Sequence, residues 1–250
     1  AVGAVAARGD RAWIGAGWRL QGLDVTDPAR PVPLGQSEML PEAIRGLEIV
    51  GDVVLAAVGQ HGLVVFDVTD AARPARVASI PTDWATNDVV VAGERAYLVE
   101  GASGLRILDV TDPASPRELG RIDTPGDALG VAVVGGIAYV ADWGMGVRVI
   151  DVADPRAPRD VAWIDTPGEA AGVAVEGDVL VVADRFAGLR TIDVADPASP
   201  RARGAVAVPG LAERAMLAAG HAFVAAGQGG LVVVGVRDPD RPVVRRPPGD

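Results

Sequence analysis

One phrase returns along the whole chain: a glycine, a short apolar run, an aspartate and, three residues later, a second aspartate followed by proline. The clearest copies span 104–113, 146–155 and 188–197, with weaker copies at 62–70 and 230–239 and a degenerate one at 19–28. The first aspartate falls at Asp24, Asp67, Asp109, Asp151 and Asp193, with Gly235 in the sixth copy. The steps of 43, 42, 42, 42 and 42 residues form a fixed period, which indicates a repeat architecture.

Each copy contains four short segments with strand character, seen best in the fourth copy at 129–134, 137–141, 147–152 and 159–164. The Gly135-Gly136 pair fits a two-residue hairpin between the first two segments, and similar pairs recur in every copy. Four-stranded antiparallel sheets repeated six times predict an all-β, six-bladed β-propeller, with blades in sequence order and no strand exchanged at closure. We expect one domain over residues 1–250, with repeats at about 1–43, 44–85, 86–127, 128–169, 170–211 and 212–250. An open solenoid is the alternative architecture.

Composition removes several functional classes. The net charge of −10 argues against a nucleic-acid partner, because phosphate neutralisation needs a cationic surface. The chain has neither lysine nor cysteine, so lysine Schiff-base chemistry, disulfides and thiolate metal sites are excluded.

Residues 215–236 carry no formal charge and are long enough to resemble a membrane helix. Five glycines and the repeat frame predict three strands there instead, so we expect no membrane insertion.

The phrases Gly-Leu-Arg-Ile-Leu-Asp-Val-Thr-Asp-Pro and Gly-Val-Arg-Val-Ile-Asp-Val-Ala-Asp-Pro, with Ala-Tyr-Val-Ala-Asp upstream, resemble the LVIVD repeat family. The resemblance covers the whole chain and is strongest in repeats three to five. It implies a bacterial or archaeal β-propeller, commonly on exported or surface proteins, and therefore an extracellular or cell-surface location. It implies no single activity, because a fold does not fix a function. Gly235 in place of the aspartate and Ala71 in place of the proline are departures that affect the expected local turn geometry.

The repeated Asp-x-x-Asp-Pro element offers two carboxylates, as a calcium site would. Calcium prefers about six or more oxygen ligands, so we favour a structural role in which the second aspartate caps a turn that proline stiffens. The two histidines, His61 and His221, are expected at opposite ends of the blades, which disfavours a two-histidine metal site. We predict no metal and no cofactor.

Differences between the copies indicate where function lies, because shared positions maintain the blade. Divergence concentrates in the loop between the second and third strands and in the linker between blades, which we expect on one face around the mouth of the central channel. Loops on a rigid scaffold commonly carry binding residues. The predicted ligand-binding residues are Trp18, Arg19, Arg45, His61, Trp84, Asn87, Asp142, Trp143, Arg185, Phe186 and Arg214.

Each candidate also has a structural interpretation. The aspartates Asp142 and Asp184 serve equally as strand-end caps, and the aromatic side chains as covers for the blade tops. The arginines can neutralise nearby acids instead of clamping a carboxylate ligand, and His61 can be a solvated loop residue.

We expect a non-enzymatic recognition or scaffold propeller that binds a protein or glycan on the channel-mouth face. The alternative is a small lyase, isomerase or hydrolase using acid–base residues and arginines on the same face. Its candidate catalytic residues are Glu100, Asp142, Asp184 and His61. A raised carboxylate pKa inside a deep pocket would favour the enzyme. The sequence does not fix the oligomeric state.

Overall fold

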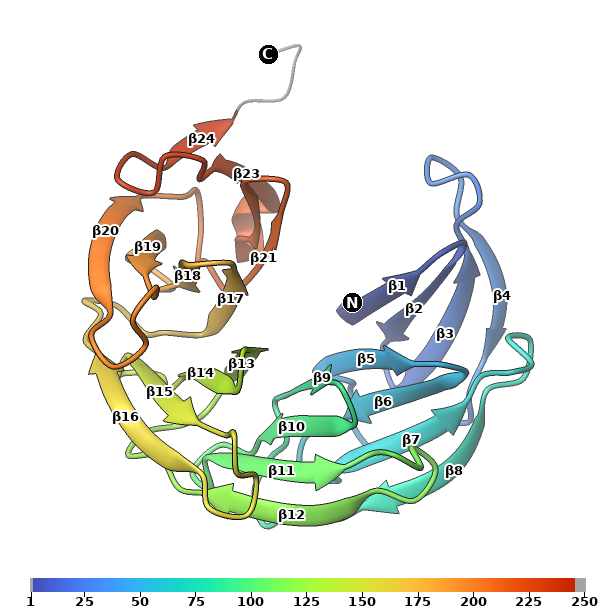
Figure 1. Ribbon diagram of the computed structural model, residues 1–250. Helices are drawn as coiled ribbons and strands as arrows, with labels where there is room; N and C mark the ends of the chain where they lie inside the picture. The colour runs from blue at the N-terminus through green and yellow to red at the C-terminus, as the bar shows by residue number, and fades with distance from the viewer. Residues whose placement is uncertain (1, 246–250) are drawn as a thin grey trace. The chain divides into compact units, whose positions relative to one another are not determined.

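The computed structural model describes residues 2–245, which form twenty-four strands in six four-stranded antiparallel sheets. The fold is an all-β six-bladed propeller, and each blade uses four consecutive strands in sequence order. The chain divides into two compact units, 1–120 and 121–250, with the division inside the last strand of the third blade. The two units are described separately (Figure 1).

The first three blades lie in the first unit, up to the division. Their strands are β1 Val2–Arg8, β2 Arg11–Ala16, β3 Arg19–Asp24, β4 Val32–Gln36, β5 Gly46–Val50, β6 Val53–Ala57, β7 Leu63–Asp67, β8 Ala75–Ile80, β9 Asp88–Ala92, β10 Arg95–Val99, β11 Leu105–Asp109 and β12 Arg117–Ile122.

The last three blades lie in the second unit. Their strands are β13 Gly130–Val134, β14 Ile137–Ala141, β15 Val147–Asp151, β16 Arg159–Ile164, β17 Gly172–Glu176, β18 Val179–Ala183, β19 Leu189–Asp193, β20 Arg201–Val206, β21 Arg214–Ala218, β22 His221–Ala225, β23 Leu231–Gly235 and β24 Val243–Arg245. A single 3-10 turn, η1 Gly227–Gly229, precedes β23.

The predicted strands of the fourth copy are confirmed to within one residue at each end. Gly135 and Gly136 join β13 to β14 with φ of 57° and 80°, the double left-handed conformation that a tight hairpin of this type requires. Residues 215–236 form β21, β22 and β23 with the short turn before β23, as predicted from the repeat frame. No helix in the described part of the chain is long and apolar enough to span a membrane.

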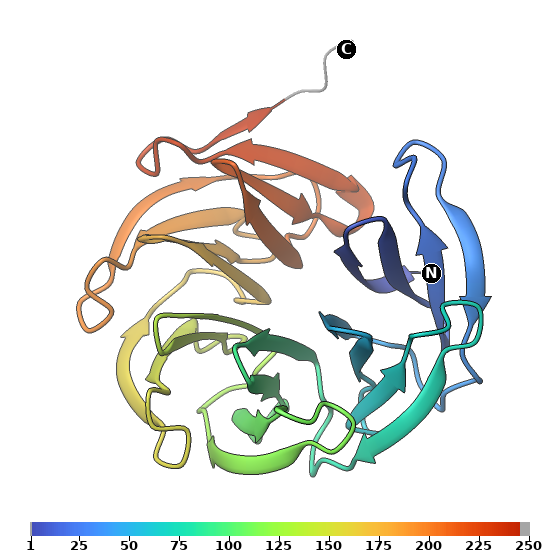
Figure 2. The ribbon, with the colours of Figure 1, turned by 45° about the vertical axis from the view of Figure 1, so that its right-hand side comes forward.

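Blades pack face to face within each unit, so their middle strands are buried on both sides. The first strands lie beside one another, β1 with β5 and β5 with β9 in one unit, β13 with β17 and β17 with β21 in the other (Figures 1 and 2). The last four residues of β6, β10, β14 and β18 are all buried. Burial of valine, leucine and alanine between sheets supplies most of the stabilisation.

The turn after each third strand repeats one hydrogen-bond pattern. The second aspartate of each copy accepts a bond from the backbone N–H two residues on, as Asp112 does from Ala114 at 3.1 Å. Ala72 donates to Asp70 at 3.0 Å in the same way, so Ala71 keeps the turn that the other copies build with proline. The first aspartate also bonds two residues ahead, as Asp151 does with Ala153, and only this second bond is lost at Gly235. The structural interpretation of the Asp-x-x-Asp-Pro element is therefore confirmed.

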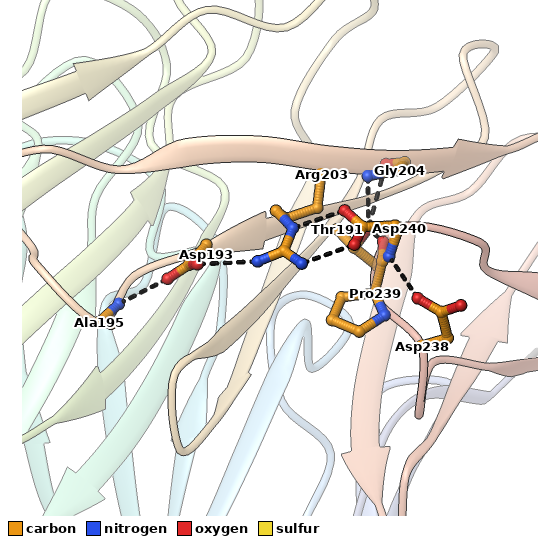
Figure 3. A network of polar contacts seen from close by, with 8 residues as sticks. All are labelled: Thr191, Asp193, Ala195, Arg203, Gly204, Asp238, Pro239 and Asp240. Carbon is orange, nitrogen blue, oxygen red and sulfur yellow. Dashed lines mark hydrogen bonds and ion pairs between the residues drawn. The ribbon is translucent and has the colours of Figure 1, made fainter.

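Polar contacts join β19 and β20 of the fifth blade to the turn between β23 and β24 of the sixth (Figure 3). The guanidinium of Arg203 on β20 donates two bonds of 2.6 Å to the carboxylate of Asp240 and one of 2.9 Å to Asp193. The hydroxyl of Thr191 donates to the carbonyl of Pro239. The final blade of the second unit is thus tied to its neighbour by charge as well as by apolar packing.

Candidate functional site

Within each unit, the loops between second and third strands and the blade linkers meet at the same end, as predicted. Isolated β-bridges join Gly59 to Thr86, Trp143 to Ala170, and Arg185 to Ala212. The Trp143–Ala170 bridge has two backbone hydrogen bonds of 3.1 and 3.0 Å. Each bridge connects the loop of one blade to the linker that enters the next. The loop ends are therefore fixed by backbone pairing and can present side chains in defined positions.

Asp142 follows β14 and is fully buried. One carboxylate oxygen accepts a 2.7 Å hydrogen bond from the Thr124 hydroxyl, and the other accepts a 3.0 Å bond from the Gly126 backbone N–H. Burial raises the pKa of this carboxyl, and the two hydrogen bonds oppose the shift. Through these two hydrogen bonds Asp142 fixes the linker that leads from the third blade into the fourth.

Asp184 occupies the same place in the fifth blade and is also fully buried. It accepts a 3.1 Å bond from the Gly168 N–H, and burial again raises its pKa. The Thr166 hydroxyl lies close enough to lower that pKa, yet Thr166 Oγ1 and the free carboxylate oxygen fall outside hydrogen-bond geometry. Thr166 and Asp184 are the counterparts of Thr124 and Asp142, because the linkers before the fourth and fifth blades share the sequence Asp-Thr-Pro-Gly. The contact between Thr166 and Asp184 is slightly longer than that between Thr124 and Asp142.

Each buried carboxylate also faces an arginine six residues later in the chain. Glu100 is 2% exposed and lies 3.5 Å from Arg106, which in turn pairs with Glu118 at 2.8 Å. Arg148 and Arg190 occupy the matching positions relative to Asp142 and Asp184 and lower the pKa values of these carboxyls by their charge, while the ion pair of Arg148 is made with Asp160.

The second and sixth blades replace both members of this pair with small apolar residues. They hold Val58 with Val64 and Ala226 with Val232. In blades two to six the carboxylate and the arginine are therefore either both present or both replaced, which is expected when a buried charge without a partner is costly. This pattern gives all three candidate acids, Glu100, Asp142 and Asp184, a structural role in the blade.

Trp143 and Arg185 carry the most unusual backbone at the loop ends. They adopt φ of 52° and 42°, in the left-handed region, where the matching positions of the second, third and sixth blades hold Gly59, Gly101 and Gly227. The Arg185 guanidinium lies over the Trp143 ring, 4.8 Å from its centroid, and pairs with Glu169 at 3.2 Å. The linked residues belong to adjacent blades of the second unit, so the structure brings these two predicted site residues together.

Exposed apolar side chains accompany this pair in the loops of the second unit. Phe186 is 66% exposed and directly follows Arg185, while Met145 is 48% exposed and shares the Trp143 loop. The indole N–H of Trp163 donates to the Met145 carbonyl at 2.5 Å, which fixes a further exposed tryptophan beside the same loop. Arg214, at the start of β21, is half-buried.

The predicted residues of the first unit form a more scattered set. Arg45 donates a 2.8 Å hydrogen bond to the Asn87 amide oxygen, so these two come together. Arg19 instead donates to the Ser37 carbonyl at 2.6 Å, which gives it a structural contact. The remaining predicted residues are exposed at the loop ends, namely Trp18, Trp84 and His61.

Sequence comparison missed Glu48, which lies in the middle of β5. Its side chain shares a strand face with Gly46, whose Cα approaches Asp88 on the neighbouring β9 so closely that a Cβ there would lie 2.7 Å from a carboxylate oxygen. Burial and the Asp88 charge raise the pKa of Glu48 from 4.5 to about 7. The matching positions hold Val90, Ala132, Ala174 and Met216, so a search of strands as well as loops could have found it.

His221 lies in the β21–β22 hairpin, at the end of the second unit opposite the loops. No group of three or more histidine, aspartate and glutamate side chains among residues 2–245 is placed to hold a metal ion.

The family model of the LVIVD repeat matches residues 85–124, 125–166, 167–208 and 209–245. No curated protein matches the sequence. Among solved structures, a chain of the mitotic checkpoint complex is 12% identical, with a TM-score of 0.77 over 93% of this chain and 73% of that one. A protein of unknown function from Desulfotomaculum acetoxidans is 11% identical, with a TM-score of 0.74 over 98% and 89%. A chain of the nidogen/laminin complex is 14% identical, with a TM-score of 0.67 over 96% and 94%. At these identities the structural matches establish the fold alone.

Proposed function

Because the chain belongs to the LVIVD repeat family, whose fold prescribes no activity, we propose from its side chains that it is a non-enzymatic recognition propeller. It binds a protein or glycan through the loop end of the second unit. The contact surface consists of Trp143, Met145, Trp163, Arg185 and Phe186. We place this recognition outside the cell, in keeping with the exported and surface proteins on which such repeats commonly occur.

The left-handed backbone of Trp143 and Arg185 is the observation that carries the proposal. A non-glycine residue in this conformation costs about 1–2 kcal/mol, and the other repeats avoid the cost with glycine. The loop itself requires a left-handed residue here, as the glycines of the other blades show, but it does not require a residue other than glycine, and strain accepted in this way is characteristic of functional positions. Here the strained residues supply a tryptophan face and a guanidinium.

The chemistry of the surface suits a ligand with a flat apolar face and polar groups at its edge. Tryptophan rings stack against sugar rings and protein side chains, and arginine donates planar pairs of hydrogen bonds. Arg185 is held by the Trp143 ring and Glu169, so its guanidinium is already oriented before a ligand arrives. Preorganised side chains lose less entropy on binding.

The test screens the immobilised full chain against a glycan array and a displayed peptide library, and then measures the Kd of each hit. Trp143→Gly and Arg185→Gly introduce the residue that other blades use, so both variants are expected to fold. We expect each to weaken a genuine hit at least tenfold. Ala219→Gly is the matched control, because it relieves the same kind of strain at the opposite end of the same unit. An absence of hits, or hits that bind both glycine variants unchanged, would contradict the proposal.

An enzymatic function is the second candidate, and Glu48 is the observation that favours it. A carboxylate with a pKa of about 7 beside Asp88 could exchange a proton at neutral pH, and the Arg45–Asn87 pair adjoins it in sequence. If this alternative is correct, Glu48→Gln abolishes turnover while the glycine variants at Trp143 and Arg185 leave it intact. The two functions are thus separated by two sets of variants.

A further inference from the structure

The first unit holds a cavity at the hairpin end of its first two blades, opposite the loop end. Its volume is about 650 Å³. The cavity lies between the β1–β2 hairpin, the β5–β6 hairpin and the turn that follows β7. That volume falls within the range of about 300–1,000 Å³ typical of small-molecule sites.

A single departure from the repeat accompanies this cavity. Ala71 lines it, and every other copy has proline at that position, at Pro28, Pro113, Pro155, Pro197 and Pro239. A hollow on the fifth blade that is bordered by Pro239, the residue matching Ala71, measures only about 160 Å³. Because the Ala71 turn keeps the same hydrogen bonds, the missing pyrrolidine ring enlarges the space without altering the backbone pattern.

The polar network of Figure 3 shows a second difference between the two junctions. There, Thr191, Arg203 and Asp240 tie the fifth blade to the sixth. The matching residues at the junction of the first and second blades are Gly22, Leu34 and Ala72, which carry no polar side chain. At the junction of the second and third blades the same positions hold Val65, Val77 and Ala114, so the absence of this network is not special to the cavity, and Ala71 is the departure that sets its junction apart.

The walls of the cavity combine charge with apolar surface. Arg8 and Arg11 are directly paired across β1 and β2, and both guanidinium-bearing side chains line the rim. Asp52 and Thr69 add a carboxylate and a hydroxyl. The inner wall consists of the apolar side chains of Trp13, Ile49, Val68 and Ala71, of which Trp13 and Val68 are almost completely buried.

We propose that this cavity binds a small organic carboxylate with an apolar body of one or two rings. The paired arginines recognise the carboxylate by charge-assisted hydrogen bonds. The body of the ligand packs on Trp13, Ile49, Val68 and Ala71. Asp52 accepts a hydrogen bond from a donor on the ligand. This site is independent of the loop surface proposed above.

The experiment titrates the full chain with 2-naphthoate and with its neutral analogue 2-naphthamide by calorimetry. We expect 2-naphthoate to bind at least tenfold more tightly, because both ligands share the apolar body and only one carries the anion. Ala71→Pro restores the residue of the other copies, and we expect it to weaken 2-naphthoate binding at least tenfold by filling the cavity. Arg8→Gln and Arg11→Gln should each have a similar effect through loss of charge.

Arg95→Gln is the matched control, because Arg95 begins β10 as Arg11 begins β2. It should leave the 2-naphthoate affinity within twofold of the original. The proposal is overturned if 2-naphthoate does not bind at millimolar concentration, or if it binds no better than the amide. Unchanged affinity in the folded Ala71→Pro variant would overturn it as well. Thermal unfolding of each variant establishes that it is folded.

Discussion

Glu48 makes the stability of this protein depend on pH near neutrality. Its pKa rises from 4.5 to about 7 on folding, chiefly through burial and secondly through the Asp88 charge. Each pKa unit corresponds to about 1.4 kcal/mol, so the full difference is about 3.4 kcal/mol. Because the side chain is only half-buried, solvent screening reduces the expected effect to about 2 kcal/mol.

The direction follows from the protons that each state binds. Below pH 4.5 the carboxyl is protonated in both states, so it does not affect the free energy of unfolding. Between pH 4.5 and 7 the unfolded chain ionises first, and stability falls as the pH rises. Above pH 7 the penalty is complete and constant.

Substitution by glutamine removes this penalty. We expect Glu48→Gln to match the original protein near pH 4 and to be about 2 kcal/mol more stable at pH 8.5, which is roughly 4–8 °C in Tm for a chain of this size. Urea and thermal unfolding across that pH range provide the measurement. Asp142 and Asp184 contribute with the same sign, but they are present in both proteins and cancel in the difference.

A second variant tests the cause of the shift. Asp88→Asn removes the neighbouring charge but leaves the burial, so the pH dependence should shrink without disappearing. A stability difference between Glu48→Gln and the original protein that does not vary with pH would refute the reasoning.

Three further substitutions test the structural interpretation by unfolding in urea. Asp142→Ala should cost about 3 kcal/mol because it leaves the buried Thr124 hydroxyl and the Gly126 backbone N–H without their acceptor, while Arg148 keeps its ion pair with Asp160. Asp142→Asn, which retains an acceptor oxygen for one of the two hydrogen bonds, should cost less; equal losses would contradict this role of the carboxylate. Ala219→Gly should stabilise by about 0.5–1 kcal/mol, since Ala219 has φ of 52°, and a loss of stability would count against it. Gly62→Ala should cost more than about 2 kcal/mol because the new Cβ would lie 2.2 Å from the Ile80 carbonyl oxygen. Gly51 has a similar φ but no atom within 4 Å of the added Cβ, so Gly51→Ala should cost only about 1 kcal/mol. Similar losses in the two variants would exclude the steric explanation.

The architecture was predictable because the same strand-forming and turn-forming residues recur at a fixed spacing along the sequence. Each copy carries its own hairpin glycines, its own β-branched strands and its own aspartate turn. The alternation of these signals places strands such as β14 Ile137–Ala141 without knowledge of any distant contact. The shared end of loops and linkers also followed, because antiparallel strands fix which connections lie together.

The roles of individual polar residues were less accessible. Asp142 and Asp184 resembled candidate catalytic acids, and only the folded linkers show which backbone N–H groups they accept from. Those N–H groups lie 16 residues earlier in the chain, so no local sequence pattern predicts the hydrogen bonds. Glu48 was missed because its pKa depends on a neighbour from another blade.

The sequence alone determined that this protein is a six-bladed propeller, since strand and turn preferences act between near neighbours and recur in every copy. Tertiary structure decided which carboxylates are buried, where Trp143 meets Arg185, and that Ala71 borders a cavity. Those outcomes depend on how one blade packs against the next. Packing brings together side chains that are distant in the chain, and only in the packed blades are their desolvation and their electrostatic interactions determined.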